Sequence, residues 1–207
     1  MTRSSLMAVL AVCAVILAMS AGCAQAGALV DFDDLIMPPY SYQQIGGDRY
    51  MAQGMLLSTV NGWIGLHNEL DGITNTSPNY CFAWNGFTYS EIIVDFVVPR
   101  TTTPGLTDIC TFYVTDFTGE NEEQGTWTAL IRGVDGIVLD SVSGTGSNVP
   151  VAFSRANKDI TQMMFIPSSD KEGIDTLAHC EVVPVPEPAS LSVLAIGALG
   201  LIIRRRR

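Results

Sequence analysis

Short runs of alternating apolar and polar residues fill the middle of the chain and most limit the folds it can adopt. The period is clearest in Ile92 to Val97 and in Cys110 to Thr115. A period of two residues places alternate side chains on opposite faces of a β-strand. Further strand-forming runs lie at 50–60, 62–67, 126–132, 136–142, 149–154 and 160–166. About nine to eleven strands at this spacing, with no convincing amphipathic helix, predict an all-β fold, a single antiparallel β-sandwich.

Turn-forming dipeptides separate these runs. They include Asp71-Gly72, Asn85-Gly86, Thr118-Gly119 and Asp135-Gly136. Val134-Asp135-Gly136-Ile137 in particular predicts a tight hairpin, because Asp-Gly favours the positive φ angles of a two-residue turn.

The first 26 residues have the pattern of a cleaved signal peptide. Arg3 precedes an uncharged apolar run, Leu6 to Met19, and the segment closes in small residues. Ala24-Gln25-Ala26 supplies the small residues that a signal peptidase reads, with Ala24 and Ala26 flanking Gln25. We therefore predict export, with the mature protein beginning at Gly27.

A lipoprotein signal is the alternative for the same segment. Ala21-Gly22-Cys23 ends like one, and Cys23 would then be lipidated and become the first residue. Such signals usually carry Leu three positions before the cysteine, where this chain has Ser20. Cleavage before Gly27 is the preferred interpretation.

The end of the chain has three parts in order. Val183 to Pro188 is Pro-rich, which predicts extended backbone unable to continue a strand ladder. Ala189 to Ile203 is an uncharged run that as a helix measures only about 22 Å, against a hydrocarbon core of about 30 Å. Arg204, Arg205, Arg206 and Arg207 form a basic stop that stays cytoplasmic. The domain boundaries predicted from these ends are 27–182 for the sandwich and 183–207 for the tail.

This tail closely resembles the PEP-CTERM sorting signal of Gram-negative bacteria. The resemblance rests on Val185, Pro186, Glu187 and Pro188, on the Leu/Ala/Gly segment 189–203 and on the terminal arginines. It implies an exosortase that cuts near the Pro-Glu-Pro motif and an inner-membrane precursor. It also implies delivery to the cell surface or to the exopolysaccharide matrix. The alternative is an ordinary single-span anchor that is never cut.

The segment between the two ends is strongly acidic. Residues 27–187 hold all 21 acidic residues and six basic ones, a formal charge of −15. Nucleic acids and anionic lipids carry the same sign, so electrostatic binding to either is excluded. Calcium and neutral sugars remain compatible, and solubility outside the cell is the simpler reason for the charge.

Two segments at opposite ends of this domain are similar to each other. They are Val30-Asp31-Phe32-Asp33-Asp34-Leu35 and Gly173-Ile174-Asp175-Thr176-Leu177, with Tyr50-x-x-x-Gly54 between them. Together they resemble jelly-roll domains similar to carbohydrate-binding modules of the galactose-binding-like fold. The resemblance implies that the first and last strands lie side by side, with Asp33 or Asp34 near Asp175.

Four carboxylates are candidates for a structural calcium site: Asp33, Asp34, Asp48 and Asp175. Ca²⁺ takes six to eight oxygen ligands, which clustered carboxylates and carbonyls at a strand edge can supply. The alternative is that these residues end strands and bind turn amides, and it is favoured because no Asp-x-Asp-x-Asp-Gly spacing occurs.

The sequence predicts no enzyme. His67 and His179 are the only imidazoles, and neither a Gly-x-Ser-x-Gly nor a His-Glu-x-x-His motif is present. Trp63 and Trp84, which border Gly or Asn turns, are candidates for sugar stacking, although aromatic residues in strands more often serve packing. The leading hypothesis is a structural or adhesive surface protein, and the alternative is a carbohydrate-binding module for matrix polysaccharide.

Three cysteines remain after the predicted cleavage, Cys81, Cys110 and Cys180. In an oxidising compartment an odd number predicts one disulfide and one unpaired thiol. The sequence leaves the pairing open.

Overall fold

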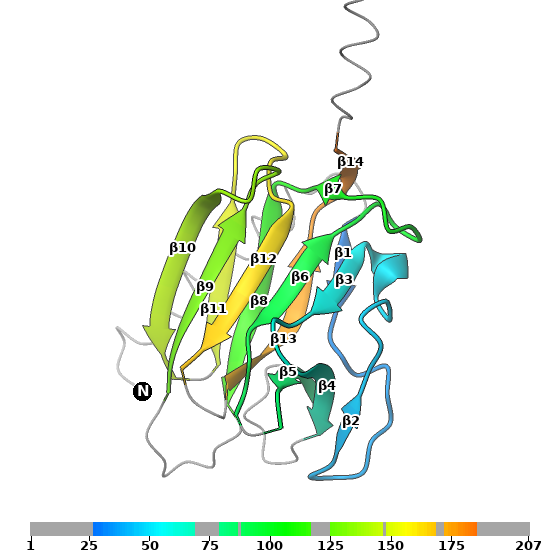
Figure 1. Ribbon diagram of the computed structural model, residues 1–207, viewed down its shortest axis with the longest axis vertical. Coiled ribbons are helices and arrows are strands. Elements are labelled where there is room, and N and C mark those ends of the chain that lie inside the picture. The colour runs from blue at the N-terminus through cyan, green and yellow to red at the C-terminus, as the bar shows by residue number, and fades with distance from the viewer. Residues whose placement is uncertain are drawn as a thin grey trace, which may run out of the picture.

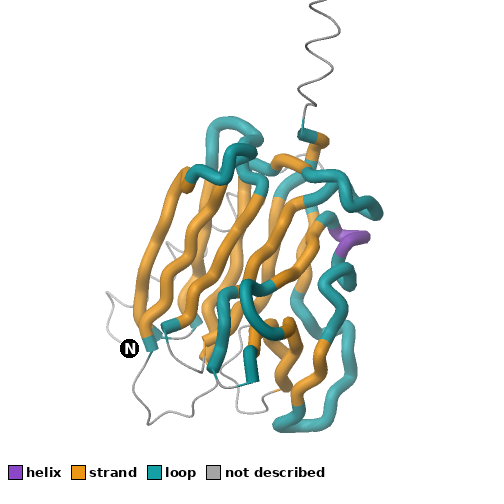
Figure 2. Tube along the Cα trace, viewed as in Figure 1, coloured by secondary structure: helices purple, strands orange, loops and turns teal. Residues whose placement is uncertain are grey.

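The computed structural model describes residues 27–68, 79–86, 88–116, 125–146, 148–168 and 172–185. Within these ranges the chain is strand and loop apart from one short 3-10 helix, η1 (Met51–Gln53), drawn in purple in Figure 2. No helix in these ranges is long and apolar enough to cross a membrane. Two antiparallel sheets pack face to face (Figure 1), which confirms the predicted all-β sandwich.

Sheet A has seven strands, and its outer face carries an aromatic surface and a separate depression. Its order is β11 (Val149–Ser154), β8 (Ile109–Asp116), β13 (Glu172–His179), β5 (Asn79–Trp84), β4 (Trp63–Asn68) and β2 (Tyr42–Gln44), and β1 (Ala28–Val30) also pairs with β13. Sheet B has the order β10 (Val138–Thr145), β9 (Thr126–Arg132), β12 (Gln162–Pro167), β6 (Ile92–Phe96) and β3 (Met55–Ser58). A third, two-stranded sheet pairs β7 (Gly105–Leu106) with β14 (Val183–Pro184).

The core lies between the two sheets and follows the period-two pattern. In β6 the alternation is as predicted, with Ile92, Val94 and Phe96 buried and Ile93 and Asp95 half-buried. Aromatic rings from the two sheets meet in the core, Phe112 of β8 lying 6.1 Å from Phe165 of β12 between ring centroids. Burial of this apolar surface is the main stabilising contribution to the fold.

The run predicted as a strand at 50–60 is one only in its second half. Met51–Gln53 form η1, which Gly54 ends with a left-handed φ of 88° and a bond from its N–H to the Met51 carbonyl. Glycine adopts that conformation without a Cβ clash. The strand therefore begins at Met55.

The first and last strands of the domain lie side by side, as the jelly-roll resemblance implied. Val30 pairs with Leu177 and Ala28 with His179 in an antiparallel ladder. β13 also carries an irregularity between Asp175 and Ala178, where Thr176 has a φ of 51°. On the N-terminal side of this irregularity, Ile174 of β13 pairs with Cys81 of β5. β1 and β5 therefore lie on the same side of β13, one after the other.

Candidate functional site

The outer face of sheet A over β2, β4 and β5 is aromatic. Ile64 and Leu66 of β4 and their neighbours Cys81 and Ala83 of β5 are buried in the core between the sheets. Alternate residues of a strand point to opposite faces. The outer face of these two strands therefore carries Trp63, Gly65, His67, Tyr80, Phe82 and Trp84.

Five rings on this face form one continuous set, which we call the aromatic strip: Tyr42, Trp63, Phe82, Trp84 and Tyr89. Tyr42 stacks on Trp63 with centroids 6.0 Å apart, and Trp63 meets Phe82 edge-on at 5.3 Å. Tyr89 continues the strip, with its ring 5.4 Å from Phe82 and 5.5 Å from Trp84. Spacings and tilts of this kind are those that aromatic pairs prefer.

Gly65 lets the strip lie close to the sheet. A Cβ at this position would lie 2.4 Å from Cζ3 of Trp63 and 3.0 Å from Cε1 of Phe82. The two rings therefore occupy the space that a side chain would fill. No sequence motif marks this role, because a glycine within a strand is usually taken as a bulge or a weak point.

The strip has a buried base and accessible rings. Phe82 is only 4% exposed, whereas Tyr42 is 68% exposed, and Trp63, Trp84 and Tyr89 are half-buried. An apolar, partly exposed ring is suited to contact with the C–H face of a sugar or with another apolar group.

The structure brings together the two residues predicted to stack on sugar. Trp63 and Trp84 are directly opposed in the antiparallel ladder between β4 and β5. Both lie at the end of the sandwich where β3 finishes, since a short turn at 59–62 joins Ser58 to Trp63. A ligand role for either residue stays a prediction.

His67 and Tyr80 lie further along the same face. Their rings are 5.4 Å apart, and the His67 ring is 6.3 Å from Phe82. Burial lowers the pKa of His67 to about 4, so its imidazole is neutral at neutral pH. It supports the strip as an uncharged ring.

His179 is used inside the fold. Its Nε2 lies 2.8 Å from the Gln53 carbonyl and its Nδ1 lies 2.5 Å from the Cys180 carbonyl, while its ring packs 5.3 Å from Phe96 of sheet B. Burial lowers its pKa, against a smaller raising effect of the two carbonyl contacts. This histidine links the end of β13 to sheet B.

The four candidate calcium ligands are held by different neighbours. Asp34 forms an ion pair with Arg49 at 2.7 Å and accepts a 2.8 Å hydrogen bond from the Tyr50 hydroxyl. Asp33 Oδ1 lies 3.4 Å from the backbone N–H of Asn79.

The other two candidates have hydrogen bonds of their own. Asp48 accepts a bond from Met51 N–H through its carbonyl, and the buried Asp175 accepts one from Thr176 N–H through its carboxylate. Across the described ranges, no three Asp, Glu, His or Cys side chains are grouped to hold a metal ion. Calcium binding stays a prediction for a titration to test.

Cys81 and Cys110 are free and fully buried. The expected disulfide between two of the three cysteines is therefore wrong, since neither of these two takes part in one. The reason is geometric: β13 lies between the strands that carry them, and Cys81 is opposite Ile174 whereas Cys110 is opposite His179. Two strand spacings already exceed the Cα separation that a disulfide tolerates, about 7 Å. Burial raises the pKa of both thiols.

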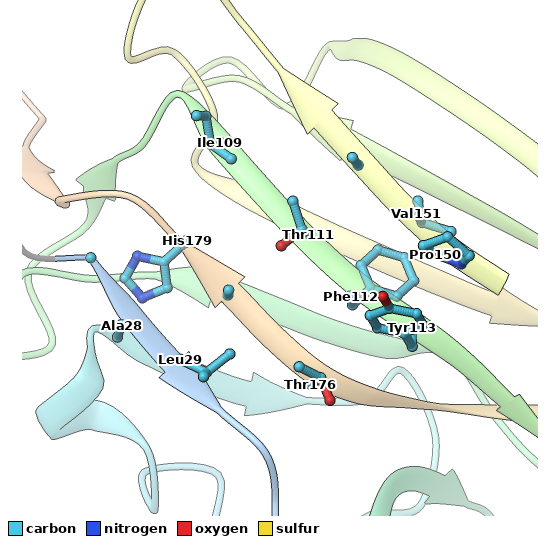
Figure 3. A pocket seen from close by; sticks show the side chains of 13 residues that line it. Ala28, Leu29, Ile109, Thr111, Phe112, Tyr113, Pro150, Val151, Thr176 and His179 are labelled. Carbon is cyan, nitrogen blue, oxygen red and sulfur yellow. The ribbon is translucent and has the colours of Figure 1, made fainter. Parts of the chain in front are cut away.

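A depression lies elsewhere on the outer face of sheet A, away from the aromatic strip. It has a volume of about 350 Å³ and crosses β1, β13, β8 and β11 (Figure 3). Leu29, Ile109, Pro150 and Ala152 make its lining mainly apolar, and Thr111, Tyr113 and Thr176 contribute hydroxyls. His179 also lines it, and no carboxylate does.

The chain leaves the domain through a strand. Val183 pairs with Leu106 and Pro184 with Gly105, and the N–H of Val185 donates to the Pro104 carbonyl at 3.1 Å. The prediction that Val183 to Pro188 cannot join a ladder is therefore wrong for its first residues. Proline lacks only the N–H, and at the edge of a two-stranded sheet the Pro184 N–H is not required.

The contact between this strand and the domain is close. A Cβ on Gly105 would lie 2.1 Å from Cγ1 of Val182, which is itself buried in the core. Glu181, the residue before Val182, forms an ion pair with Lys158, with 2.8 Å between Lys158 Nζ and Glu181 Oε2. The domain therefore holds the chain up to Val185.

The tail that follows decides the sorting of the protein. Residues 184–207 match the PEP-CTERM protein-sorting motif. This confirms the resemblance drawn from Val185, Pro186, Glu187 and Pro188. A PEP-CTERM tail marks an exported protein that an exosortase processes on its way to the surface. Pro186 to Arg207, like Ala24 and Ala26, lie outside the described residues, so the cut sites stay predictions.

Solved structures similar to this chain share little sequence with it. A DUF4465 family protein from Bacteroides caccae is 9% identical with a TM-score of 0.43, over 76% of this chain and 100% of that one. CBM61 in complex with β-1,4-galactotriose is 7% identical with a TM-score of 0.39, over 68% and 94%. The CBM22-1 xylan-binding domain of Paenibacillus barcinonensis Xyn10C is 9% identical with a TM-score of 0.37, over 79% and 99%. No curated protein matches the sequence.

Proposed function

We propose that this PEP-CTERM protein is a non-enzymatic structural or adhesive component of the cell surface or the exopolysaccharide matrix. In this proposal the inner membrane holds the precursor by the tail until an exosortase cuts it. The observation that carries the proposal is how the chain leaves the domain, through Val183 to Val185, which we call the stem of the tail. Within the described residues, the last hydrogen bond along the chain is made by Val185, and the Pro-Glu-Pro motif follows at once in the sequence.

A non-enzymatic role is supported by how the domain uses its titratable groups. His67 is a neutral ring further along the aromatic face, and the ring nitrogens of His179 lie within hydrogen-bond distance of two backbone carbonyls. The 350 Å³ depression is lined mainly by apolar groups. General acid–base chemistry needs a positioned proton donor or acceptor facing a substrate. His179 lines the depression, but both of its ring nitrogens lie within hydrogen-bond distance of backbone carbonyls, those of Cys180 and Gln53.

Replacement of Pro186-Glu187-Pro188 by three alanines tests the sorting role. Export is expected to continue, because the signal peptide is untouched, while the full-length protein accumulates in the inner membrane. Fractionation and immunoblotting of the native host measure this. If the variant reaches the surface at the processed size, the proposal of exosortase processing is wrong.

The aromatic strip favours a second candidate, binding of matrix polysaccharide. Trp63 and Trp84 are opposed in the ladder and partly exposed, which is the arrangement that pyranose C–H faces can cover. The charge of −15 favours a neutral glycan over an acidic one.

A glycan array with the released protein tests this candidate. Trp63→Ala or Trp84→Ala is expected to weaken binding at least tenfold, and Val142→Ala on the exposed edge strand β10 serves as the control. Equal binding by all three variants, or no binding by the parent protein to any glycan, would leave the adhesive role without a sugar ligand.

A further inference from the structure

The end of the sandwich from which the tail leaves has an exposed apolar tip. The turn between β9 and β10 is a hairpin at the predicted place, with bonds from Gly133 N–H to the Ile137 carbonyl and from Gly136 N–H to the Gly133 carbonyl. Of the Asp135-Gly136 pair only Gly136 has a positive φ, 74°, so the turn is not the two-residue type. Val134 and Ile137 are 64% and 61% exposed in it. Asp135, between them, turns its carboxylate back to the N–H of Ile137 at 3.1 Å.

Backbone contacts connect this tip to the stem of the tail. The carbonyl of Arg132, at the base of the hairpin, accepts a bond from Thr161 N–H. Ile160, which precedes Thr161, forms an antiparallel bridge with Thr107. Leu106, which precedes Thr107, pairs with Val183 of β14. In Figure 1 the β9–β10 turn and β14 accordingly lie at the same end of the molecule.

The length of chain beyond Val185 limits how far this end can be from the membrane. Ala189, the first residue of the apolar run, is four residues further on, so full extension covers at most about 14 Å. The headgroup region on each side of a bilayer is about 5 to 8 Å thick. Because the run is about 8 Å short of the hydrocarbon thickness, it draws the domain inward.

The charges at this end differ from those of the domain as a whole. Four of the six basic residues in 27–187 lie in the loops and strand ends here: Arg100, Arg132, Arg155 and Lys158. Two of them neutralise acidic neighbours, Arg155 bonding Asp159 at 2.9 Å and Lys158 bonding Glu181 at 2.8 Å. Asp108 and Asp135 also lie at this end and offset the charges of Arg100 and Arg132. This end is therefore close to neutral, the charge of −15 is concentrated away from it, and repulsion from headgroups is weak where the tail holds the domain close.

We propose that the end of the sandwich bearing β14 rests on the lipid bilayer while the tail is attached, with Val134 and Ile137 of the β9–β10 turn in contact with the lipid. This inference rests on the proposed membrane-held precursor. An apolar side chain at the tip gains free energy from leaving water, and the short tether removes the entropic cost of finding the surface.

Full-length protein in phosphatidylcholine vesicles tests the contact directly. Ile137→Trp and Val60→Trp each add one tryptophan, and bromine on the lipid chains quenches fluorescence only within close range. Ile137 and Val60 are matched, at 61% and 59% exposed, but Val60 lies in the turn after β3, at the opposite end. The added fluorescence of Ile137→Trp is expected to be quenched at least twofold more than that of Val60→Trp.

The outcomes separate the inference from the proposed function. If the protein floats with the vesicles and both variants are quenched equally, the docked end is wrong although the anchor stands. If the protein does not float with the vesicles, the membrane-held precursor and the inference both fail. Adding Val134→Asp to Ile137→Trp is expected to reduce the quenching, and an unchanged signal would overturn the apolar contact. Circular dichroism of each variant checks that the fold is kept.

Discussion

Acid is expected to destabilise the protein through His67, the ring at the inner end of the aromatic face. The pKa of an unfolded histidine is about 6.5, and burial lowers that of His67 to about 4. Between about pH 4 and pH 6.5, therefore, His67 is mostly protonated in the unfolded chain and mostly neutral in the folded chain. Stability rises with pH wherever the unfolded state binds more protons, so it is lost as pH falls from about 6.5 to about 4.

The size of the effect follows from the two pKa values. A shift of one pKa unit corresponds to 1.36 kcal/mol, which sets a limit of about 3 kcal/mol for His67. At pH 4.5 most of this limit applies, about 2.5 kcal/mol. This is a large share of a typical unfolding free energy of 5–15 kcal/mol.

His67→Phe is the variant that isolates this contribution. Phenylalanine keeps a ring against Tyr80 and Phe82 but cannot titrate. Urea unfolding of parent and variant at pH 7.0 and pH 4.5 gives the free energy of unfolding at each pH. The parent is expected to lose about 2.5 kcal/mol more than the variant, since the carboxylates titrate equally in both. Parallel losses would refute the assignment of a buried, neutral His67.

Three further outcomes are expected. Gly65→Ala places a methyl group 2.4 Å from Trp63 Cζ3, so near-ultraviolet circular dichroism of the tryptophans is expected to change and any glycan affinity to fall. Gly105→Val forces the stem away from Val182, so limited proteolysis is expected to cut before Val185, at sites protected in the parent. Titration with Ca²⁺ is expected to raise the melting temperature if the predicted site exists, with Asp34→Asn removing the gain, and a flat titration retires the site.

The sequence predicts the fold best where one face of a strand is buried. β9 and β11 have the bounds expected from the runs at 126–132 and 149–154, and in both strands buried residues alternate with residues that are exposed or half-buried. β5 was missed for the opposite reason. Asn79 to Ala83 are all buried, the inner face by the core and the outer face by aromatic rings, so no alternation appears.

The candidate site could be predicted only in part. The turns that border Trp63 and Trp84 single them out in the sequence, and the structure opposes the two residues in the ladder. Phe82 and Gly65 could not be found in this way, because their roles depend on the register between β4 and β5, which links residues 17 positions apart in sequence. The strand at Val183–Pro184 cannot be predicted from the sequence, because prolines indicate an unpaired segment and the two residues of the partner strand, Gly105 and Leu106, give no strand pattern.

The position of the aromatic strip relative to the tail has a consequence for how the protein acts over its lifetime. Trp63 and Trp84 lie at the end of the sandwich where β3 finishes, and β14 lies at the end where β3 begins, next to Phe96 and Val97. If the strip binds polymer as proposed, a precursor held at the membrane by the opposite pole is bivalent and can fasten polymer to the cell that made it. Cutting the tail removes one of the two attachments and leaves a monovalent molecule that coats polymer without bridging. The exosortase cut would then set the ratio of cross-links to coating in the matrix.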